Sequence, residues 1–327
     1  VITTVADDIT SENIDEVYPQ YFPKQNTELE AYQQIEKDLL DAVLYAPDNT
    51  PGNKTLFSKS VARTLLAKIY AEKPLRDYTK VIQYCDEVKA DGFDLVDDFS
   101  DLFGMNAAGT DAKMRNTKES ILEAQFTSGA GNWCTWMFGR DLVNWNNNFT
   151  WAKWVTPSRD LISAFKQEGD EVRFKESIVY YDCNWSNYYP SDNYPFMYKC
   201  RSANSSIIKY RYADVLLLKA EALIMQDTPD LEGAADIIDE VRDRAKLGAL
   251  PTSVRSNKNV LLNALLKERR LELAFEGQRW FDLVRLDKVE EVMNAVYAKD
   301  SGRKAQIYTF DKNSYRLPIP QSVIDAN

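Results

Sequence analysis

The side chains best suited to recognising a ligand in this chain are aromatic rings and amides concentrated in one short segment. Five of the seven tryptophans lie between residues 133 and 154, interleaved with asparagines and an arginine. These tryptophans are Trp133, Trp136, Trp145, Trp151 and Trp154. Flat aromatic rings surrounded by polar groups are typical of a recognition surface.

This mixture of side chains has the chemistry that carbohydrate binding requires. A pyranose ring has an apolar face of C–H bonds that can stack on an indole, and its hydroxyl groups both donate and accept hydrogen bonds. Amide side chains offer an acceptor and two donors in fixed directions, and arginine adds a planar set of donors. We expect Trp145, with Asn144 and Asn146 on either side, to make the leading contacts. The other expected ligand-binding residues are Trp133, Trp136, Trp151 and Arg140.

The alternative is that these tryptophans belong to the hydrophobic core, because most tryptophans are largely buried. A fully buried segment of this composition would also bury many amide groups, each of which would then need a hydrogen-bond partner. We therefore favour an exposed surface for the cluster as a whole. A second run, residues 185–198, carries a similar mixture of tyrosines, asparagines and a tryptophan.

The composition excludes several classes of chemistry. The 327 residues include no histidine, which excludes imidazole acid–base catalysis, Ser-His-Asp nucleophiles and His-ligated metals. A net charge of −10 argues against a nucleic-acid partner, and no glycine-rich nucleotide motif occurs. We predict no catalytic residue, no cofactor and no metal. Glycoside hydrolysis by two carboxylates remains an alternative, but nothing in the sequence places two acidic residues across a cleft.

Two smaller features each allow two interpretations. Residues 97–101, DDFSD, could hold calcium but lack the spacing of a known calcium loop, so capping of a short turn is favoured. Cys183 and Cys200 could form a disulfide, whereas free, mostly buried thiols are the favoured interpretation for the four cysteines. No apolar run reaches the length of a membrane span, and no signal peptide is present.

Hydrophobic periodicity predicts a mostly α-helical chain in which pairs of helices form hairpins. The expected helices cover residues 27–45, 58–72, 78–90, 211–226, 231–246, 257–275, 280–285 and 289–298. Short strands are expected at residues 120–126, 177–181 and 206–209. The rest of residues 105–205 is expected to be an irregular insertion, since it shows no strong periodicity.

One run, Leu265–Lys288, is dense in both apolar and charged residues. Its apolar side chains fall on several faces of a helix, which predicts burial on more than one side. The charged residues between them should be paired, because an unpaired buried charge costs several kcal/mol. The ion pairs available at helical spacing are Arg269–Glu272, Glu276–Arg279 and Asp282–Arg285.

Four stretches carry a family resemblance. They are SKSVARTLLAKIYAEK (Ser58–Lys73), IIKYRYADVLLLKAEALIMQ (Ile207–Gln226), ERRLELAFEGQRWFDLVRL (Glu268–Leu286) and SYRLPIPQSVIDAN (Ser314–Asn327). In sequence and in order they resemble motifs of the SusD/RagB family, the glycan-binding lipoproteins of Bacteroidetes-type polysaccharide utilisation systems. Residues 105–205 match the family only loosely.

The resemblance implies a mostly α-helical, SusD-like fold with tetratricopeptide-like hairpins. Residues 1–327 would form a single, partial domain that lacks the N-terminal part of the family. Within it, residues 27–104 would form a helical hairpin region and residues 206–327 a helical C-terminal region. The irregular, aromatic-rich residues 105–205 would face the glycan.

The resemblance also implies a function and partners. The protein would bind an oligosaccharide or polysaccharide at the cell surface and deliver it to a SusC-like TonB-dependent transporter, with the helical hairpins docking on the transporter. It would not be an enzyme. It would face outward from the outer membrane, attached only by an upstream lipid anchor that is absent from this chain. An alternative from another class is a helical-repeat scaffold for proteins that has no sugar site.

Overall fold

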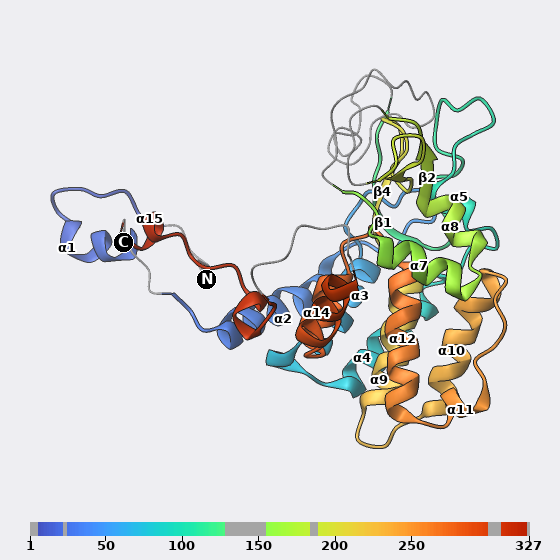
Figure 1. Cartoon of the computed structure of the whole chain (residues 1–327). Helices are drawn as coiled ribbons and strands as arrows, with labels where there is room; N and C mark the ends of the chain where they lie inside the picture. Colours follow the sequence, from blue (N-terminus) through green and yellow to red (C-terminus); the bar gives the residue numbers. More distant parts are fainter. Residues whose placement is uncertain (1–5, 22–24, 128–154, 184–188, 300–308, 326–327) are drawn as a thin grey trace.

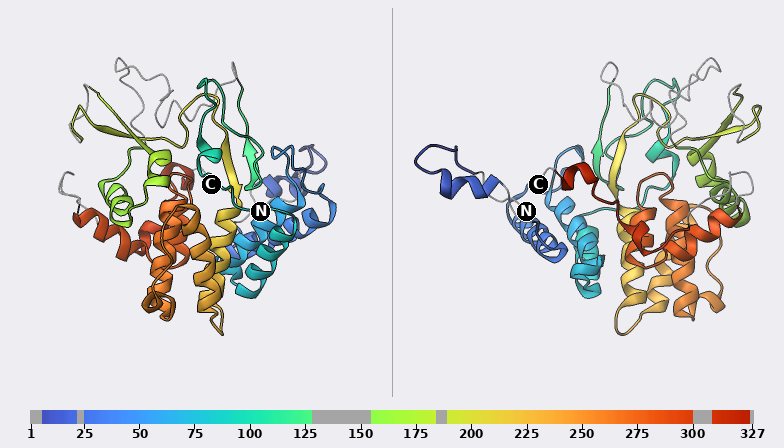
Figure 2. Two further views of the ribbon diagram at one scale, coloured as in Figure 1. Left: turned by 90° about the vertical axis from the view of Figure 1, so that its right-hand side faces the viewer. Right: turned by 60° about the vertical axis from the view of Figure 1, so that its left-hand side comes forward.

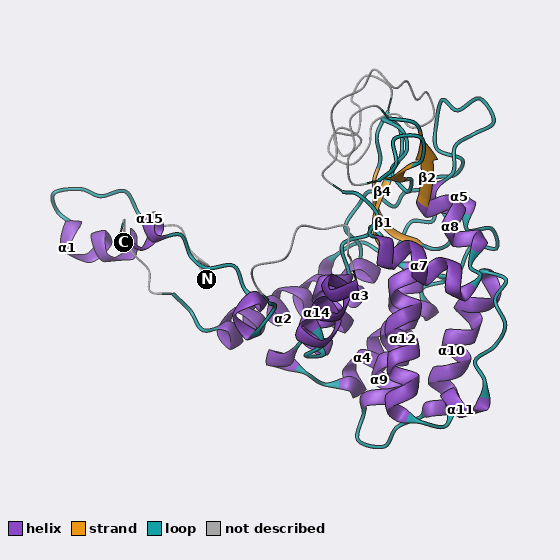
Figure 3. Cartoon of the chain, viewed as in Figure 1, coloured by secondary structure: helices purple, strands orange, loops and turns teal. Residues whose placement is uncertain are grey.

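The computed structural model describes residues 6–21, 25–127, 155–183, 189–299 and 309–325. Most of its helices pack into one body, whereas α1 (Ile14–Val17) and α15 (Gln321–Ile324) lie apart from it, and the short strands gather at one end of the body (Figures 1 and 3). Two further views show the same separation of helices from strands (Figure 2). The predicted mostly α-helical architecture is confirmed.

Antiparallel helical hairpins form the body. Helix α2 (Glu28–Tyr45) packs on α3 (Lys59–Ala71), which pairs with α4 (Tyr78–Ala90). Helix α9 (Tyr212–Met225) packs against α4 and pairs with α10 (Leu231–Arg244). These hairpins are of the tetratricopeptide-like kind that was expected, and α12 (Lys258–Glu272) closes the body against α9 and α10.

Helix α9 is the centre of the main core. Leu217, Ala213, Ala220 and Ala222 are fully buried, and α9 shows no polar stripe because α4, α10 and α12 all pack against it. Small alanine side chains allow these neighbouring helices to approach closely, and leucines fill the space between them. The charged residues of α9 within this core therefore need partners from other elements.

The remaining helices are short. They are α1 (Ile14–Val17), α5 (Ser100–Phe103), α7 (Arg159–Glu168), α8 (Glu171–Ser177), α11 (Thr252–Arg255), α13 (Arg279–Arg285), α14 (Val289–Lys299) and α15 (Gln321–Ile324). Single turns of 3-10 helix occur at Tyr18–Tyr21, Lys73–Leu75 and Lys312–Tyr315.

Helices α7 and α8 correct the expectation that residues 105–205 are irregular apart from two strands. The Ser158 hydroxyl accepts a hydrogen bond from the Leu161 N–H and starts α7, and Gly169 ends α7 in the left-handed conformation that suits glycine. Asp170 caps α8 in the same way, through the Arg173 N–H. Both capping signals are local and readable, but the helices are too short to show strong periodicity.

The strands form two antiparallel pairs. Strand β1 (Ser120–Ala124) pairs with β4 (Ile207–Arg211), and β2 (Ile178–Tyr181) pairs with β3 (Tyr194–Met197). Strands were expected at three of these four places. Strand β3 was not expected, because its sequence YPFM shows no alternation and all four of its residues are buried.

Candidate functional site

The ligand-binding residues predicted from the sequence all lie outside the described residues, in the gap between Thr127 and Val155. They are Trp133, Trp136, Arg140, Asn144, Trp145, Asn146 and Trp151. Their prediction is therefore untested. The structure does define the elements on both sides of this segment, since β1 leads to it and α7 follows it.

The chain before residue 128 is fixed to the neighbouring strand region by one arginine. The Arg115 guanidinium donates hydrogen bonds to the Phe126 and Asn204 carbonyl oxygens, at 2.7 and 2.9 Å, and to the Ser206 hydroxyl at 2.9 Å. An arginine can do this because its five N–H donors lie in one rigid plane. The approach to the aromatic segment is thus held in place on the β4 side.

The chain after residue 154 is fixed by tyrosines. The hydroxyls of Thr156 and Tyr194 lie 2.6 Å apart, and the Tyr189 hydroxyl donates to the Pro157 carbonyl oxygen at 2.8 Å. The Arg159 guanidinium lies 4.8 Å from the centre of the Tyr189 ring. Both ends of the tryptophan-rich segment are therefore attached to the end of the molecule that carries the strands.

The described part of the second aromatic run is mostly core. Tyr194 and Phe196 on β3 are buried and contact one another, with ring centres 5.0 Å apart. Tyr181 and Tyr189 pack against them, together with the buried Cys183. The two aromatic runs have similar compositions, but this does not mean that Tyr194 and Phe196 form a binding surface. Both side chains are buried and stabilise the β2–β3 pair.

A pocket of about 160 Å³ opens between the two strand pairs and the turn that follows α12. Phe103, Met197, Lys199, Phe275 and Glu276 contribute to its walls. The Lys199 ammonium donates to the Glu276 carboxylate at 2.5 Å and to the Glu272 carbonyl oxygen at 2.8 Å. Burial lowers the pKa of Lys199 to about 8, although the charge of Glu276 opposes this shift.

Beneath this pocket lies a buried ion-pair network centred on Glu272. Its carboxylate is paired with Arg211 at 2.5 Å, with Arg173 at 3.0 Å and with Arg244. The Glu119 carboxylate bridges Arg211 and Arg244 from the other side, at 2.7 and 2.5 Å. Burial alone would raise the pKa of Glu272, but the three guanidinium groups hold it well below its usual range.

The ion pairs predicted from helical spacing are only partly correct. Asp282 pairs with Arg285, as expected. Glu272, however, pairs across the fold rather than with Arg269, whose guanidinium contacts Asp282 at 2.8 Å and Asp214 at 2.7 Å. Both members of this predicted pair instead form ion pairs with residues distant in the sequence, which a local spacing rule cannot predict.

The end of α12 at Glu272 explains why the third predicted pair, Glu276–Arg279, does not form. Glu276 contacts Lys199 and Arg211 and not Arg279, which donates to the Leu266 carbonyl oxygen at 2.8 Å. The helix ends at Glu272, and the turn that follows has φ values of +66° at Phe275 and +79° at Gly277. Glu276 and Arg279 therefore do not lie on one helix.

For residues 97–101 and for the pairing of Cys183, the structure agrees with the favoured interpretation. Asp98 accepts a hydrogen bond from the Ser100 N–H, and the neighbouring carboxylates face lysines: Lys113 pairs with Asp98 and Asp101. Within the described ranges, no group of acidic or cysteine side chains is arranged to hold a metal. Cys183 is a buried, free thiol, so the Cys183–Cys200 disulfide is not formed.

In the part of the chain that the structure describes, every helix is too short or too polar to cross a bilayer.

Comparison with known proteins assigns the C-terminal part of the chain to a family. The model of the SusD family matches residues 190–327. Residues 190–327 are a SusD-family region. Two curated relatives agree, both from Formosa agariphila: SusD-like protein P38 is 43% identical over 99 residues, and SusD-like protein P2 is 36% identical over 126 residues. These matches cover 28% and 37% of this chain but only 19% and 24% of the relatives.

Solved structures extend the SusD-like fold over most of the chain. A SusD-like protein from Bacteroides fragilis superposes with a TM-score of 0.70 at 21% identity, covering 92% of this chain and 70% of that one. Surface glycan-binding protein A from Bacteroides thetaiotaomicron, in complex with laminarihexaose, superposes with a TM-score of 0.68 at 19% identity, covering 90% and 68%. A laminarin-binding SusD-like protein has a TM-score of 0.64 at 23% identity, with 90% and 67% covered.

The family resemblance inferred from the sequence motifs is thereby confirmed. The structure also explains why the SusD-like motifs have these residues. Arg211 of the RYAD motif and Glu272 and Glu276 of the ELAFEG motif meet in the buried network. Sequence reasoning identified the charged residues of the second motif as paired, but it missed Arg211, Glu119 and Lys199 as their partners. The RYAD motif was a usable signal for Arg211, whereas Glu119 and Lys199 had none.

Proposed function

We propose that this protein binds an oligosaccharide or polysaccharide through the tryptophan-rich segment between residues 133 and 151. The observation that supports this most strongly is the SusD-like fold over some nine-tenths of the chain, shared with a protein solved in complex with laminarihexaose. The seven predicted contact residues bring the aromatic and amide chemistry that sugars need. Both flanks of their segment are fixed to the strand end of the molecule.

The proposal includes a role and a location. The bound glycan passes to a SusC-like TonB-dependent transporter, against which the helical hairpins dock. The protein works at the outer face of the outer membrane, held there by a lipid anchor. It performs no chemistry on the glycan, and the chain contains no histidine for acid–base catalysis.

A glycan-binding screen of the purified chain tests this proposal. Laminarin oligosaccharides are the first ligands to use, followed by an array of bacterial, plant and algal polysaccharides. The expected result is a saturable change in tryptophan fluorescence with one class of glycan and no shortening of that glycan over time. Binding to none of them would favour the protein scaffold, and release of shorter products would favour a glycoside hydrolase.

A further inference from the structure

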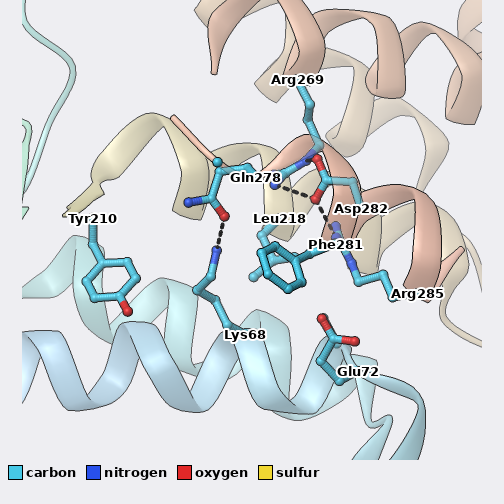
Figure 4. Close-up of a pocket in the computed structure, with 11 residues that line it drawn as sticks. Lys68, Glu72, Tyr210, Leu218, Arg269, Gln278, Phe281, Asp282 and Arg285 are labelled. Carbon is cyan, nitrogen blue, oxygen red and sulfur yellow. Dashed lines mark hydrogen bonds and ion pairs between the residues drawn. The ribbon is translucent and has the colours of Figure 1, made fainter. Parts of the chain in front are cut away.

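A second pocket, of about 270 Å³, is lined entirely by residues outside the tryptophan-rich segment. It opens between α3, strand β4, and the turn that leads into α13 (Figure 4). Lys68 and Glu72 face it from the α3 side, Tyr210 from β4, and Gln278 and Phe281 from the start of α13. The motifs of the family resemblance supply all of these residues, but the proposed function uses none of them.

Two polar groups in this pocket have unused hydrogen-bonding capacity. Among the described residues, the Glu72 carboxylate has no ion pair or hydrogen bond, and the Tyr210 hydroxyl has no hydrogen-bond partner (Figure 4). Glu72 is partly buried, and this burial raises its pKa. A desolvated carboxylate that accepts no hydrogen bond is stabilised by any ligand that donates one to it.

The donors in the pocket are also only partly used. The Lys68 ammonium donates to Asp214 at 2.7 Å and to the side-chain amide oxygen of Gln278 at 2.9 Å, which leaves one of its three N–H groups. The Gln278 amide nitrogen has a single long contact of 3.4 Å, to the Glu276 carbonyl oxygen. Hydrogen-bond acceptors and donors thus line the same pocket. This arrangement suits a ligand whose groups both donate and accept hydrogen bonds.

The other charges around the pocket are already paired. Arg269 and Arg285 both bind Asp282, and Arg285 also binds Glu221. A strongly charged ligand would have to compete with these buried pairs, whereas a neutral polar ligand leaves them intact. The ring of Phe281, which is 62% exposed, adds an apolar platform at the rim.

We propose that this pocket binds a single neutral sugar ring, through residues that the proposed function does not use. Hydroxyl groups of the sugar donate to Glu72 and accept from Lys68 and Gln278, and its C–H face packs on Phe281. The volume supports one ring and not a chain, because pockets for larger ligands measure roughly 300–1,000 Å³.

The test measures binding of free hexoses and pentoses to the full chain by saturation-transfer NMR, with D-glucose, D-galactose and L-arabinose as probes. Saturable binding of at least one neutral sugar is expected. The variants Glu72→Gln and Phe281→Ala should each weaken it roughly tenfold, since the first removes the charge of the acceptor and the second removes the apolar face on which the ring packs. Phe57→Ala, at another exposed phenylalanine, is the matched control and should bind like the wild type.

Several results would overturn the assignment. They are absence of binding by all neutral sugars, unchanged binding in both pocket variants, or tighter binding of glucuronate or methylammonium than of any neutral sugar. If Glu72→Gln fails to fold, Phe281→Ala alone decides, because its ring is largely exposed. Trp145→Ala should leave monosaccharide binding at this pocket unchanged, so failure here and failure of the proposed function give different results.

Discussion

Arg211, the last residue of β4, and Glu272, the last residue of α12, form an ion pair of 2.5 Å in which neither side chain is more than 1% exposed. Through Glu272 the same cluster reaches Arg173 on α8 and Arg244 on α10. Strand β4, and with it the paired β1 that leads to the tryptophan-rich segment, is thus connected to the helical body through buried charges. Such a network is costly to disrupt, because each remaining charge has lost water and cannot regain it.

Replacing Glu272 with glutamine should therefore destabilise the protein by about 3–5 kcal/mol, because three guanidinium groups lose a shared charge inside the fold. Urea unfolding followed by circular dichroism measures this. The matched control is Lys118→Met, whose ammonium contacts Asp94 and Asp97 at the surface, and it should cost roughly 0–1 kcal/mol. Equal losses in the two variants would mean that the buried network is not important for stability.

The burial of the Lys199 ammonium predicts a specific pH dependence of the free energy of unfolding. Burial lowers its pKa from 10.5 in the unfolded chain to about 8 in the folded protein. Between these values the unfolded chain binds more protons, so the contribution of Lys199 to stability rises with pH. The stability difference between the wild type and Lys199→Met should therefore shift in favour of the wild type as the pH rises from about 8 to about 10.5. A difference that stays flat across this range would contradict the buried position of the ammonium.

Helix α9 should be the element most sensitive to loss of apolar volume. Leu217 is fully buried in the main core, so Leu217→Ala should lower the free energy of unfolding by about 2–5 kcal/mol. Leu44 on α2 is 66% exposed, and Leu44→Ala should change stability by roughly 0.5 kcal/mol or less. Guanidinium chloride melts of both variants compare the two sites directly, and a similar loss at both would place α9 outside the core.

The helical hairpins could be predicted from sequence because their boundaries are encoded locally. Helix α4 occupies the expected residues 78–90, since Asp77 caps its first turn and Gly92 follows its end with φ of +90°. Helix α2 begins after Thr27, whose side chain and Glu30 form a reciprocal capping box. In both cases the signal lies within a few residues of the boundary.

The ion-pair partners could not be predicted, because they depend on tertiary structure. Glu272 and Arg211 are far apart in the sequence, and no spacing rule relates them. Phe281 shows the same limit: the apolar pattern of Leu265–Lys288 predicts burial on more than one side, yet the Phe281 ring is 62% exposed. The aromatic site is a third case, since composition indicates its chemistry but not which rings contact solvent.

The affinity of Trp145→Ala for the glycan that the wild type binds best tests the central claim most directly. Isothermal titration calorimetry should show binding weaker by about 1–3 kcal/mol, as for a central aromatic contact, while thermal unfolding stays close to that of the wild type. The control Tyr45→Ala, at an 83% exposed ring on α2, should bind normally. Unchanged affinity in Trp145→Ala, or a core-like stability loss of about 3–5 kcal/mol, would contradict a solvent-facing carbohydrate site at this tryptophan.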